Sequence, residues 1–420
     1  MSRIHNWSRT CLRLALPLAP VLLFALPAAA QVVPVPACRP IGSASCPATD
    51  PGGLADTAEP GSVLVFPKFD RGTVIVDPTA SGGLFPQVIP KTEIEIGAVC
   101  PGFSTGTPPQ VCTHSVYQIH VHWVCPGVTV GQVSSVCKET DFEVFVSTNG
   151  KIVFNPNGTP ARNGQLTGFP GENGNTPVPV AECERGYALA YVVNSVLAPI
   201  KHDVLVGDAL LRNTVPIAFP LNGQALESYS ALAIQADPNL ADGASITQGM
   251  DPITGTPTLV FDGNPGSVPL APVGHYQTVA GQFEGDIRFS QDDVAPFADT
   301  QLILLTLDVR SNLHNDATFV SLDFYNQREV RTSTFVSFDC WLQIQLTDID
   351  ANLNRTTQGT PSGMVVSGQA IDGEVGGLRT LLALIQTTEG AAAGPINESR
   401  SYTVRPSNNS IPVATFFTPF

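Results

Sequence analysis

Short runs of β-branched, aromatic and aliphatic residues, separated by clusters of Gly, Pro and Asn, recur along the chain from Ser62 onward. Examples are Thr73–Val76, Thr92–Ile96, Val116–Val124, Tyr187–Val193, Tyr229–Ala236, Gln301–Val309, Thr318–Tyr325, Thr334–Leu346 and Leu378–Gln386. Runs of this kind between turn residues are typical of β-strands. No stretch has the 3.6-residue period of an amphipathic helix, although Val206–Arg212 is long enough for one helical turn. The pattern predicts an all-β fold.

Two local patterns suggest how the strands are used. In the segment Phe283–Phe289, apolar and charged residues alternate, which is typical of an antiparallel strand with one buried face. Asn149-Gly150 lies between the strand candidates Phe142–Val146 and Lys151–Phe154, and both residues tolerate the positive φ of a tight hairpin turn. Many short strands at regular spacing favour two antiparallel β-sandwich domains of the immunoglobulin-like type.

The first residues have the layout of a secretory signal peptide. Arg3, Arg9 and Arg13 precede the apolar run Leu14–Pro27, and Ala28–Ala30 supplies the small residues of a cleavage site. The apolar run is shorter than the ~20 residues needed to span a bilayer, and no later stretch is long and apolar enough to do so. We therefore expect an exported protein, located in the periplasm, at the cell surface or outside the cell.

The remaining chain divides into three parts. Residues 31–60 are rich in Pro, Ala and Gly without periodicity, and are expected to form an extended leader after the signal peptide of residues 1–30. Pro216, Pro220, Asn222 and Gly223 cluster where we expect the boundary between the first sandwich domain, residues 61–220, and the second, residues 221–420.

Nine cysteines are present, and removal of Cys11 with the signal peptide leaves eight. An even number in an oxidising compartment indicates disulfides rather than reactive thiols. The simplest pairing by spacing is Cys38–Cys46, Cys100–Cys112, Cys125–Cys137 and Cys183–Cys340. The absence of a Cys-x-x-Cys motif disfavours a zinc ribbon or a thioredoxin-like redox site.

The charge of the chain limits its partners. The formal net charge is −15, and only 14% of the residues are charged. Nucleic-acid binding needs clustered Lys and Arg, so a nucleic-acid partner is not expected. The charge is compatible with Ca²⁺, with basic partners or with solubility alone. Self-assembly and a surface or protein partner are further expectations for an exported protein of this kind.

Three histidines form the first candidate site. His120 and His122 are expected on one face of a strand, and His114 has the same parity. Such a set binds Zn²⁺ or Cu²⁺ when a neighbouring strand supplies a further ligand. The alternative is that these histidines only occupy the polar face of the strand, opposite the core-facing Ile119, Val121 and Trp123.

A second candidate site lies at Asp348, Asp350 and Asn352, which place oxygen ligands at every second residue. This spacing resembles the start of a Ca²⁺-binding loop, but Leu353 and Gly359 replace the glycine and the bidentate glutamate of the EF-hand pattern. The alternative is a polar turn after a strand, so no cofactor is firmly assigned.

Several segments resemble a group of secreted bacterial β-rich proteins for which no activity is known. The resembling segments are Gly61–Lys68, Arg185–Tyr187, Val206–Ala209, Asp323–Asn326, Phe338–Trp341 and Leu346–Asp350. The resemblance implies an exported β-rich protein, and it transfers neither an activity nor a site residue.

No catalytic motif is recognisable in the chain, including Gly-x-Ser-x-Gly, a P-loop and His-Glu-x-x-His. The leading hypothesis is a secreted or cell-surface protein with a structural, adhesive or binding role and no catalysis. One alternative is a metal-dependent secreted enzyme that uses His120 and His122. Another is a filament subunit that donates its leader or its aromatic tail, residues 411–420, although the tail is better interpreted as a last strand that closes the second sheet.

Overall fold

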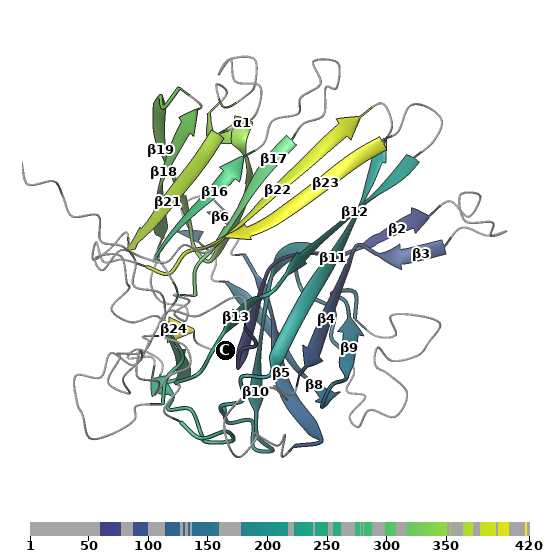
Figure 1. Ribbon diagram of the computed structural model, residues 1–420, viewed down its shortest axis with the longest axis vertical. Helices are drawn as coiled ribbons and strands as arrows, with labels where there is room; N and C mark the ends of the chain where they lie inside the picture. The colour runs from purple at the N-terminus through teal and green to yellow at the C-terminus, as the bar shows by residue number, and fades with distance from the viewer. Residues whose placement is uncertain are drawn as a thin grey trace, which may run out of the picture. The chain divides into compact units, whose positions relative to one another are not determined.

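The computed structural model of the chain is nearly all β (Figure 1). It describes residues 59–76, 87–99, 114–126, 129–130, 133–134, 137–158, 178–216, 222–237, 240–250, 255–261, 274–277, 279, 281–287, 299–307, 317–326, 328–350, 353, 364–372, 379–391, 394–402 and 416–417. Within these ranges the only helix is the single turn α1 (Leu346–Ile349). No helix of the described part is long and apolar enough to cross a membrane. The prediction of an all-β protein is confirmed.

Two antiparallel sheets share the first core. One has five strands, in the order β13 (Leu232–Ile234), β1 (Val63–Asp70), β10 (Arg185–Val193), β5 (Val116–Cys125) and β8 (Lys138–Ser147). The other has four strands, in the order β12 (Asn222–Ser230), β11 (Leu205–Pro216), β4 (Thr92–Ala98) and β9 (Lys151–Phe154). Both contribute residues to one large hydrophobic cluster that includes Trp123, Ile94 and Phe154.

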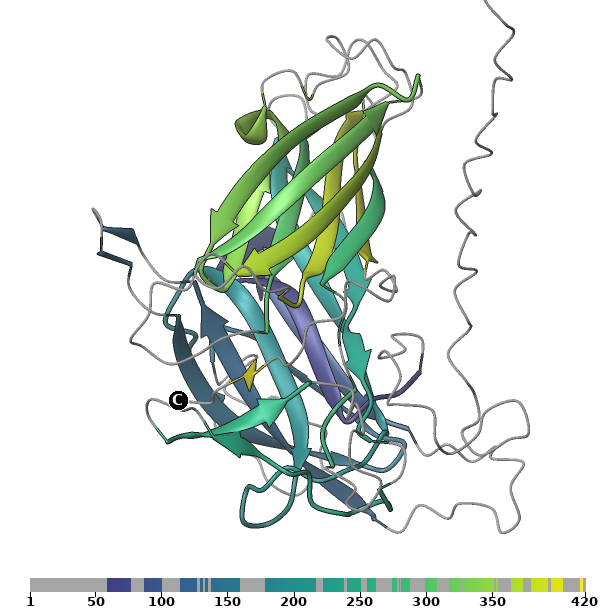
Figure 2. The ribbon, with the colours of Figure 1, turned by 90° about the vertical axis from the view of Figure 1, so that its left-hand side faces the viewer.

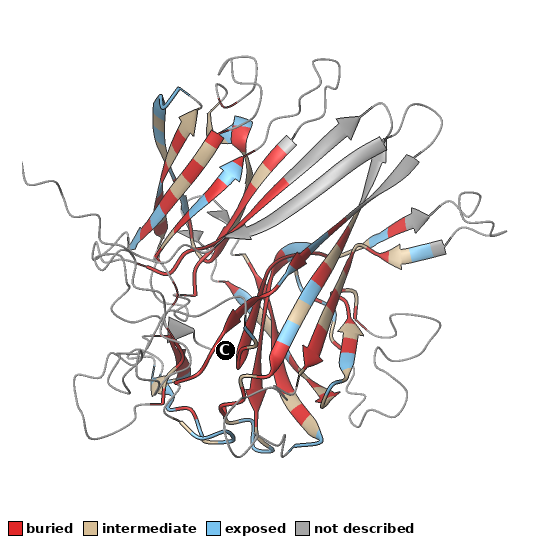
Figure 3. Cartoon of the chain, viewed as in Figure 1, coloured by how far each residue is buried: buried red, intermediate tan, exposed pale blue. Residues whose placement is uncertain are grey.

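The central strands of the five-stranded sheet are buried on both faces. Every residue of β1 is buried, and so is every residue of β10 after Arg185 (Figure 3). On β5, Trp123 and Val121 of one face and His122 of the other are all fully buried. This explains why β1 and β10 read as almost continuous apolar runs rather than as alternating patterns.

A second pair of four-stranded antiparallel sheets follows in the chain. One has the order β16 (Gln282–Ile287), β21 (Met364–Asp372), β18 (Thr318–Asn326) and β19 (Arg331–Phe338). These strands lie side by side in Figure 2. The other has the order β20 (Trp341–Gln345), β17 (Asp299–Leu305), β22 (Leu382–Ala391) and β23 (Gly394–Tyr402). They share the second hydrophobic cluster, which includes Phe283, Leu304 and Phe324.

In the β20-β17-β22-β23 sheet, residues 302–305 of β17 and 382–385 of β22 are buried and contact both clusters. Leu304 of β17 and Ile385 of β22 belong to the second cluster. Their neighbours Leu305 and Leu384 belong to the first. Side chains of successive residues point to opposite faces of a strand, so this sheet packs between the two cores.

The expected domain boundary at residues 220/221 is misplaced. It falls between β11 and β12, which pair along their whole length from Asp208↔Ser230 to Pro216↔Asn222. β12 and β13 therefore complete the first pair of sheets, although both follow the expected boundary. The described residues after Pro34 all belong to one compact unit. A cluster of Pro, Asn and Gly marks a turn equally well within a domain and between domains.

The turn at Asn149-Gly150 is correctly predicted, but the hairpin is not. Asn149 has the positive φ of 59° that such a turn requires. The flanking strands belong to different sheets, because β8 pairs with β5 and β9 pairs with β4. The turn thus carries the chain from one sheet of the first core to the other. Local turn chemistry specifies a reversal of the chain, but not which strand becomes the partner.

Three further expectations need correction. Val206–Arg212 is not a helical turn but part of strand β11. The expected strand Thr334–Leu346 is two strands, β19 and β20, in different sheets. The aromatic tail does not close the second sheet: β24 (Phe416–Phe417) pairs with β15 (Pro257–Val260) in a small sheet that also contains β14 (Gly249–Met250).

The remaining described strands form two short pairs, β2 (Thr73–Val76) with β3 (Gln87–Pro90) and β6 (Thr129–Val130) with β7 (Val133–Ser134). The alternation predicted for Phe283–Phe289 is confirmed over β16, where Phe283 and Ile287 are buried while Glu284 and Asp286 are exposed. Arg288 and Phe289 lie outside the described residues, as do the signal peptide and nearly all of the leader.

Two disulfides connect the described cysteines, and their pairing differs from the expectation. Cys125 pairs with Cys183, and Cys137 pairs with Cys340. The expected pairs Cys125–Cys137 and Cys183–Cys340 are therefore wrong. Cys125 ends β5 and Cys183 lies just before β10, its neighbour in the sheet, so strand pairing rather than sequence spacing brings the two sulfurs together. Cys38–Cys46 and Cys100–Cys112 lie outside the described residues.

Candidate functional site

The three predicted histidine ligands do not converge. His114 precedes β5, and its ring lies 4.6 Å from the ring of His202 and 5.8 Å from that of Tyr117. Tyr117 and His120 are an odd number of residues apart on β5, so they point to opposite faces of the strand. The expected three-histidine site of His114, His120 and His122 is therefore wrong. Every second side chain points to the same face only within a strand, and His114 lies before the first residue of β5.

His120 and His122 do lie together, in what we term the histidine cluster: His120, His122, Glu139, Asp141 and Tyr191. The two rings stack with their centroids 4.5 Å apart. His120 Nε2 lies 3.1 Å from Asp141 Oδ2, and His122 contacts Glu139 through Nδ1 and the Tyr191 hydroxyl through Nε2, the latter at 3.2 Å. Each histidine thus has a carboxylate partner of its own.

The histidine face of β5 is not a solvent-exposed polar face. His122 is fully buried, and His120 is only 8% exposed. Burial, followed by the charge of His120, lowers the pKa of His122 well below its usual value. Neutral His122 is therefore the form that the folded protein favours, and its two nitrogens are occupied by Glu139 and Tyr191.

The histidine cluster is not arranged as a metal centre. In the part of the chain that the structure describes, no group of three or more His, Cys, Asp or Glu side chains is placed to hold a metal ion. A zinc ligand set needs its donor atoms to converge on one point, whereas His120 and His122 are each turned to a different carboxylate. The side chains of the cluster contact one another instead.

The predicted calcium ligands fall at a strand end. Asp348 lies within α1 and is exposed, while Asp350 directly follows the helix and donates its backbone N–H to Leu346. Asn352 lies outside the described residues. The segment begins as a helical turn rather than as a loop that points successive oxygens inward, and the calcium site stays a prediction.

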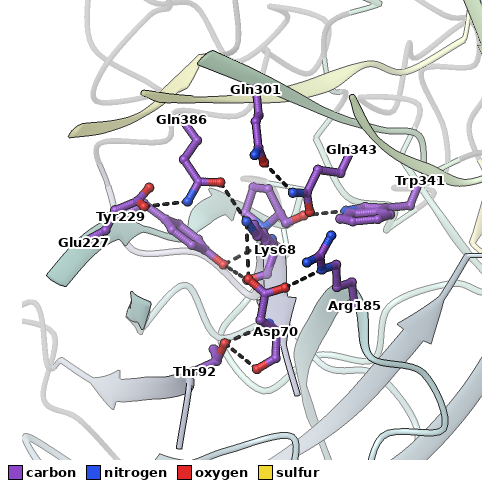
Figure 4. Close-up of polar contacts among 11 residues, drawn as sticks. Lys68, Asp70, Thr92, Arg185, Glu227, Tyr229, Gln301, Trp341, Gln343 and Gln386 are labelled. Carbon is purple, nitrogen blue, oxygen red and sulfur yellow. Dashed lines mark hydrogen bonds and ion pairs between the residues drawn. The ribbon is translucent and has the colours of Figure 1, made fainter. Parts of the chain in front are cut away.

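A second group of buried polar side chains among the described residues was not predicted as a site. We term it the lysine network: Lys68, Asp70, Glu227, Tyr229 and Gln386 (Figure 4). All five residues are buried, and they come from three strands, β1, β12 and β22. Lys68 and Gln386 are 318 residues apart in the sequence, so the network joins the two ends of the described chain.

A β-bulge aims Lys68 into this network. The pairing of β1 with β10 shifts register between Phe66 and Phe69, so that Pro67 and Lys68 lie in the bulge. Proline cannot donate a ladder hydrogen bond, and a bulge is one of the few places where a central strand tolerates it. The Pro67 carbonyl instead accepts a 2.8 Å hydrogen bond from Trp341 Nε1 of β20.

The backbone around Lys68 is held on both sides. The Tyr229 hydroxyl accepts a 3.1 Å hydrogen bond from the Lys68 N–H and donates to the Lys68 carbonyl. The Thr92 hydroxyl contacts both backbone groups of Asp70, at 2.8 Å and 2.9 Å. These contacts satisfy the polar groups that the bulge removes from the ladder and leave the Lys68 side chain little freedom of position.

The Lys68 ammonium lies between an amide and a carboxylate. Its Nζ donates to Gln386 Oε1 at 2.7 Å and lies 3.3 Å from Asp70 Oδ2. The other oxygen of Asp70 pairs with Arg185 Nε at 2.9 Å. On the far side, Gln386 Nε2 donates to Glu227 Oε2. Figure 4 shows the resulting chain of contacts from Arg185 through Asp70, Lys68 and Gln386 to Glu227.

Burial also changes the chemistry of the Glu227 carboxyl group in the lysine network. Desolvation raises its pKa to about 7, and the hydrogen bond from Gln386 and the charge of Lys68 only partly oppose this effect. Its second oxygen, Oε1, is buried and has no hydrogen-bond partner among the described residues. At neutral pH the protonated and ionised forms of this carboxyl group are therefore both populated.

The sequence carried a weak signal for the lysine network. Pro67-Lys68 interrupts the apolar run of β1, and a charged residue within a run that becomes a central strand implies a buried partner. Glu227 and Gln386 gave no such signal, because Glu227 precedes the predicted strand Tyr229–Ala236 and Gln386 is the last residue of the predicted strand Leu378–Gln386. No protein-family model matches the chain, and a search of the curated proteins finds no match either.

Proposed function

We propose that this protein is exported and has a structural, adhesive or binding role built on two immunoglobulin-like β-sandwiches, without turnover of a substrate. The observation that carries the proposal is the disulfide Cys137–Cys340, whose cysteines are 203 residues apart. A bond of this kind persists in an oxidising compartment and is rare in the cytosol. The signal-like residues 1–30 point to the same compartment.

The polar interior supports a non-catalytic role. Two groups of buried titratable residues, the histidine cluster and the lysine network, each pair their side chains with one another across strands. Networks of this kind specify one arrangement of a core. The metal-dependent enzyme is not proposed, because His114 lies apart and His120 and His122 turn to separate carboxylates. Donation of the tail to a neighbouring subunit is not proposed either, since β24 pairs within the chain.

Expression of the full chain in a Gram-negative bacterium, followed by fractionation, tests the export. We expect a chain beginning at Gln31 in the periplasm or the medium, with Cys125, Cys183, Cys137 and Cys340 resistant to alkylation until a reductant is added. A full-length chain in the cytoplasm with reactive thiols would overturn the proposal. Turnover in a broad hydrolase screen, abolished by a substitution in the histidine cluster, would overturn the non-catalytic role.

A further inference from the structure

Three groups that can react with one another are lined up in the lysine network. The Lys68 amine contacts the Gln386 amide at 2.7 Å, and the same amide contacts the Glu227 carboxyl group. Lys68, Gln386 and Glu227 are each 3% exposed, so all three lie in a desolvated interior. An amine next to a carboxamide is unreactive in water, but fixed contact and exclusion of water raise the rate of such a reaction by many orders of magnitude.

We propose that Lys68 and Gln386 react with each other to form an intramolecular amide cross-link between β1 and β22, with release of ammonia. The bond formed joins Lys68 Nζ to Gln386 Cδ, and the bond broken joins Gln386 Cδ to Nε2. No oxidation or reduction takes place, so no co-reactant is needed. The reaction does not rest on the proposed export, because it requires neither an oxidant nor a particular compartment.

Asp70 is placed to prepare the nucleophile. A lysine attacks only as the neutral amine, and Asp70 Oδ2, 3.3 Å from Lys68 Nζ, accepts the first proton. Arg185 holds the other oxygen of Asp70 at 2.9 Å and keeps the carboxylate turned toward Lys68. The neutral amine then attacks Gln386 Cδ and forms a tetrahedral centre.

Glu227 is placed to release the leaving group. Its carboxylic acid gives a proton to Gln386 Nε2, and the Cδ–Nε2 bond breaks as ammonia leaves. The resulting Glu227 carboxylate takes the second proton from the Lys68 nitrogen, which keeps its third as the amide N–H. The proton on Asp70 passes to the ammonia, which departs as ammonium, so every proton is accounted for. The pKa of about 7 that burial gives Glu227 makes both its acid and its base form available at neutral pH.

The other buried lysine of the described residues, Lys201, lacks this arrangement. Its Nζ donates to the backbone carbonyls of Asp237 and Leu240, where the same reaction would have to cut the main chain instead of releasing ammonia. Lys68 faces a side-chain amide whose departing nitrogen contacts a carboxyl group with an elevated pKa. The bulge at Pro67-Lys68 and its anchors, Tyr229 and Trp341, position the nucleophile for this one acceptor.

Peptide mapping of the purified full chain tests the proposal directly. After reduction, alkylation and trypsin digestion, we expect cleavage after Lys68 to be lost. The peptide ending at Arg71 should be joined to Thr380–Arg400, and the joined species should be about 17 Da lighter than the sum of its two parts. Recovery of Thr380–Arg400 as a linear peptide, together with full cleavage after Lys68, would overturn the proposal.

Three variants separate the cross-link from other mass losses. Lys68→Met removes the nucleophile and should give only linear Thr380–Arg400, while Glu227→Gln keeps the shape and should lower the cross-linked fraction at least about tenfold. Lys151→Met is the matched control, because Lys151 is an exposed lysine that also pairs with a glutamate, Glu95. It should leave the cross-link unchanged. Cyclisation of an N-terminal Gln31 also releases ammonia, so the intact mass alone does not decide, and the joined peptides do.

Discussion

At the scale of single residues, burial decides the chemistry of the polar side chains. His122 and Glu227 are both buried, and in both the pKa moves toward the neutral form, downward for the histidine and upward for the carboxyl group. The two effects act on stability in opposite directions. Acid favours the folded state at Glu227, because the folded protein binds a proton there more tightly than the unfolded chain. Acid disfavours the folded state at His122, because there the unfolded chain binds the proton more tightly.

The residue-scale prediction concerns His122. Its pKa is lower in the folded protein than the ~6.5 of an unfolded chain. The stability it contributes is therefore complete above about pH 6.5 and is lost as the pH falls below that value. We expect His122→Asn to reduce the pH dependence of the free energy of unfolding between pH 7 and pH 5 by at most about 1.4 kcal/mol per pH unit. Urea titrations at several pH values measure it.

The control for this prediction is His114→Gln, since His114 is exposed and lies apart from the histidine cluster. Glu227 changes the free energy of unfolding with pH in the opposite direction over the same range. The pH slope of each variant is therefore compared with the pH slope of the wild type. An unchanged slope in His122→Asn would contradict the assignment of His122 as a neutral buried group.

At the scale of elements, close approach of strands explains positions that composition leaves unexplained. Gly186 of β10 lies opposite Phe69, just beyond the bulge of β1. A Cβ atom at Gly186 would lie 2.1 Å from the Val124 carbonyl oxygen and 3.1 Å from the Phe69 ring. The carbonyl belongs to the neighbouring strand β5, which is fixed in the same sheet. Only glycine fits there, directly after the bulge that contains Lys68.

We therefore expect Gly186→Ala to destabilise the protein by at least about 2 kcal/mol, because the backbone of β5 has to move to admit the added methyl group. Thermal unfolding measures the loss. The matched control is Gly97→Ala on β4, where the nearest atom to the new Cβ is Val206 Cγ2 at 3.2 Å. Val206 is an exposed side chain that can rotate away, so little change is expected. Equal losses in the two variants would show that close approach at Gly186 is not the cause.

At the scale of the whole molecule, long-range bonds hold elements that are far apart in the chain. Cys137, directly before β8, pairs with Cys340, which lies between β19 and β20. The lysine network crosses the same large hydrophobic cluster from β1 to β22. The disulfide and the lysine network both connect strands near the C-terminal end of the described chain to strands of the first core. The described residues, all of which follow Pro34, accordingly belong to one compact unit.

Removal of each disulfide should reveal this difference in reach. The double substitution of Cys137 and Cys340 by Ser opens a loop of 203 residues, while the same change at Cys125 and Cys183 opens one of 58. Loop-closure entropy predicts that the first variant loses about 1 kcal/mol more stability than the second. Denaturant unfolding under non-reducing conditions measures both. A larger loss for the shorter loop would indicate that native-state packing, not the unfolded chain, determines the effect.

Local patterns in the sequence were sufficient for the strands themselves. The alternation in β16, the apolar runs of β5 and β10, and the turn at Asn149-Gly150 are properties of neighbouring residues, and each is found where the pattern indicates. Errors occurred where the partner of a segment is distant. Val206–Arg212 is a strand because β4 and β12 flank it, and the strands on either side of Asn149-Gly150 enter different sheets because their partners do.

The sequence by itself determined the β character of this chain, the places where it reverses and the residues available for disulfides. All of these depend on backbone preferences and on side chains within a few residues of one another. Only the tertiary structure decided that Cys125 meets Cys183, that the histidine face of β5 is buried, and that Lys68 meets Gln386. These pairs are 58 to 318 residues apart, and their contacts arise from how the sheets pack, which no local pattern records.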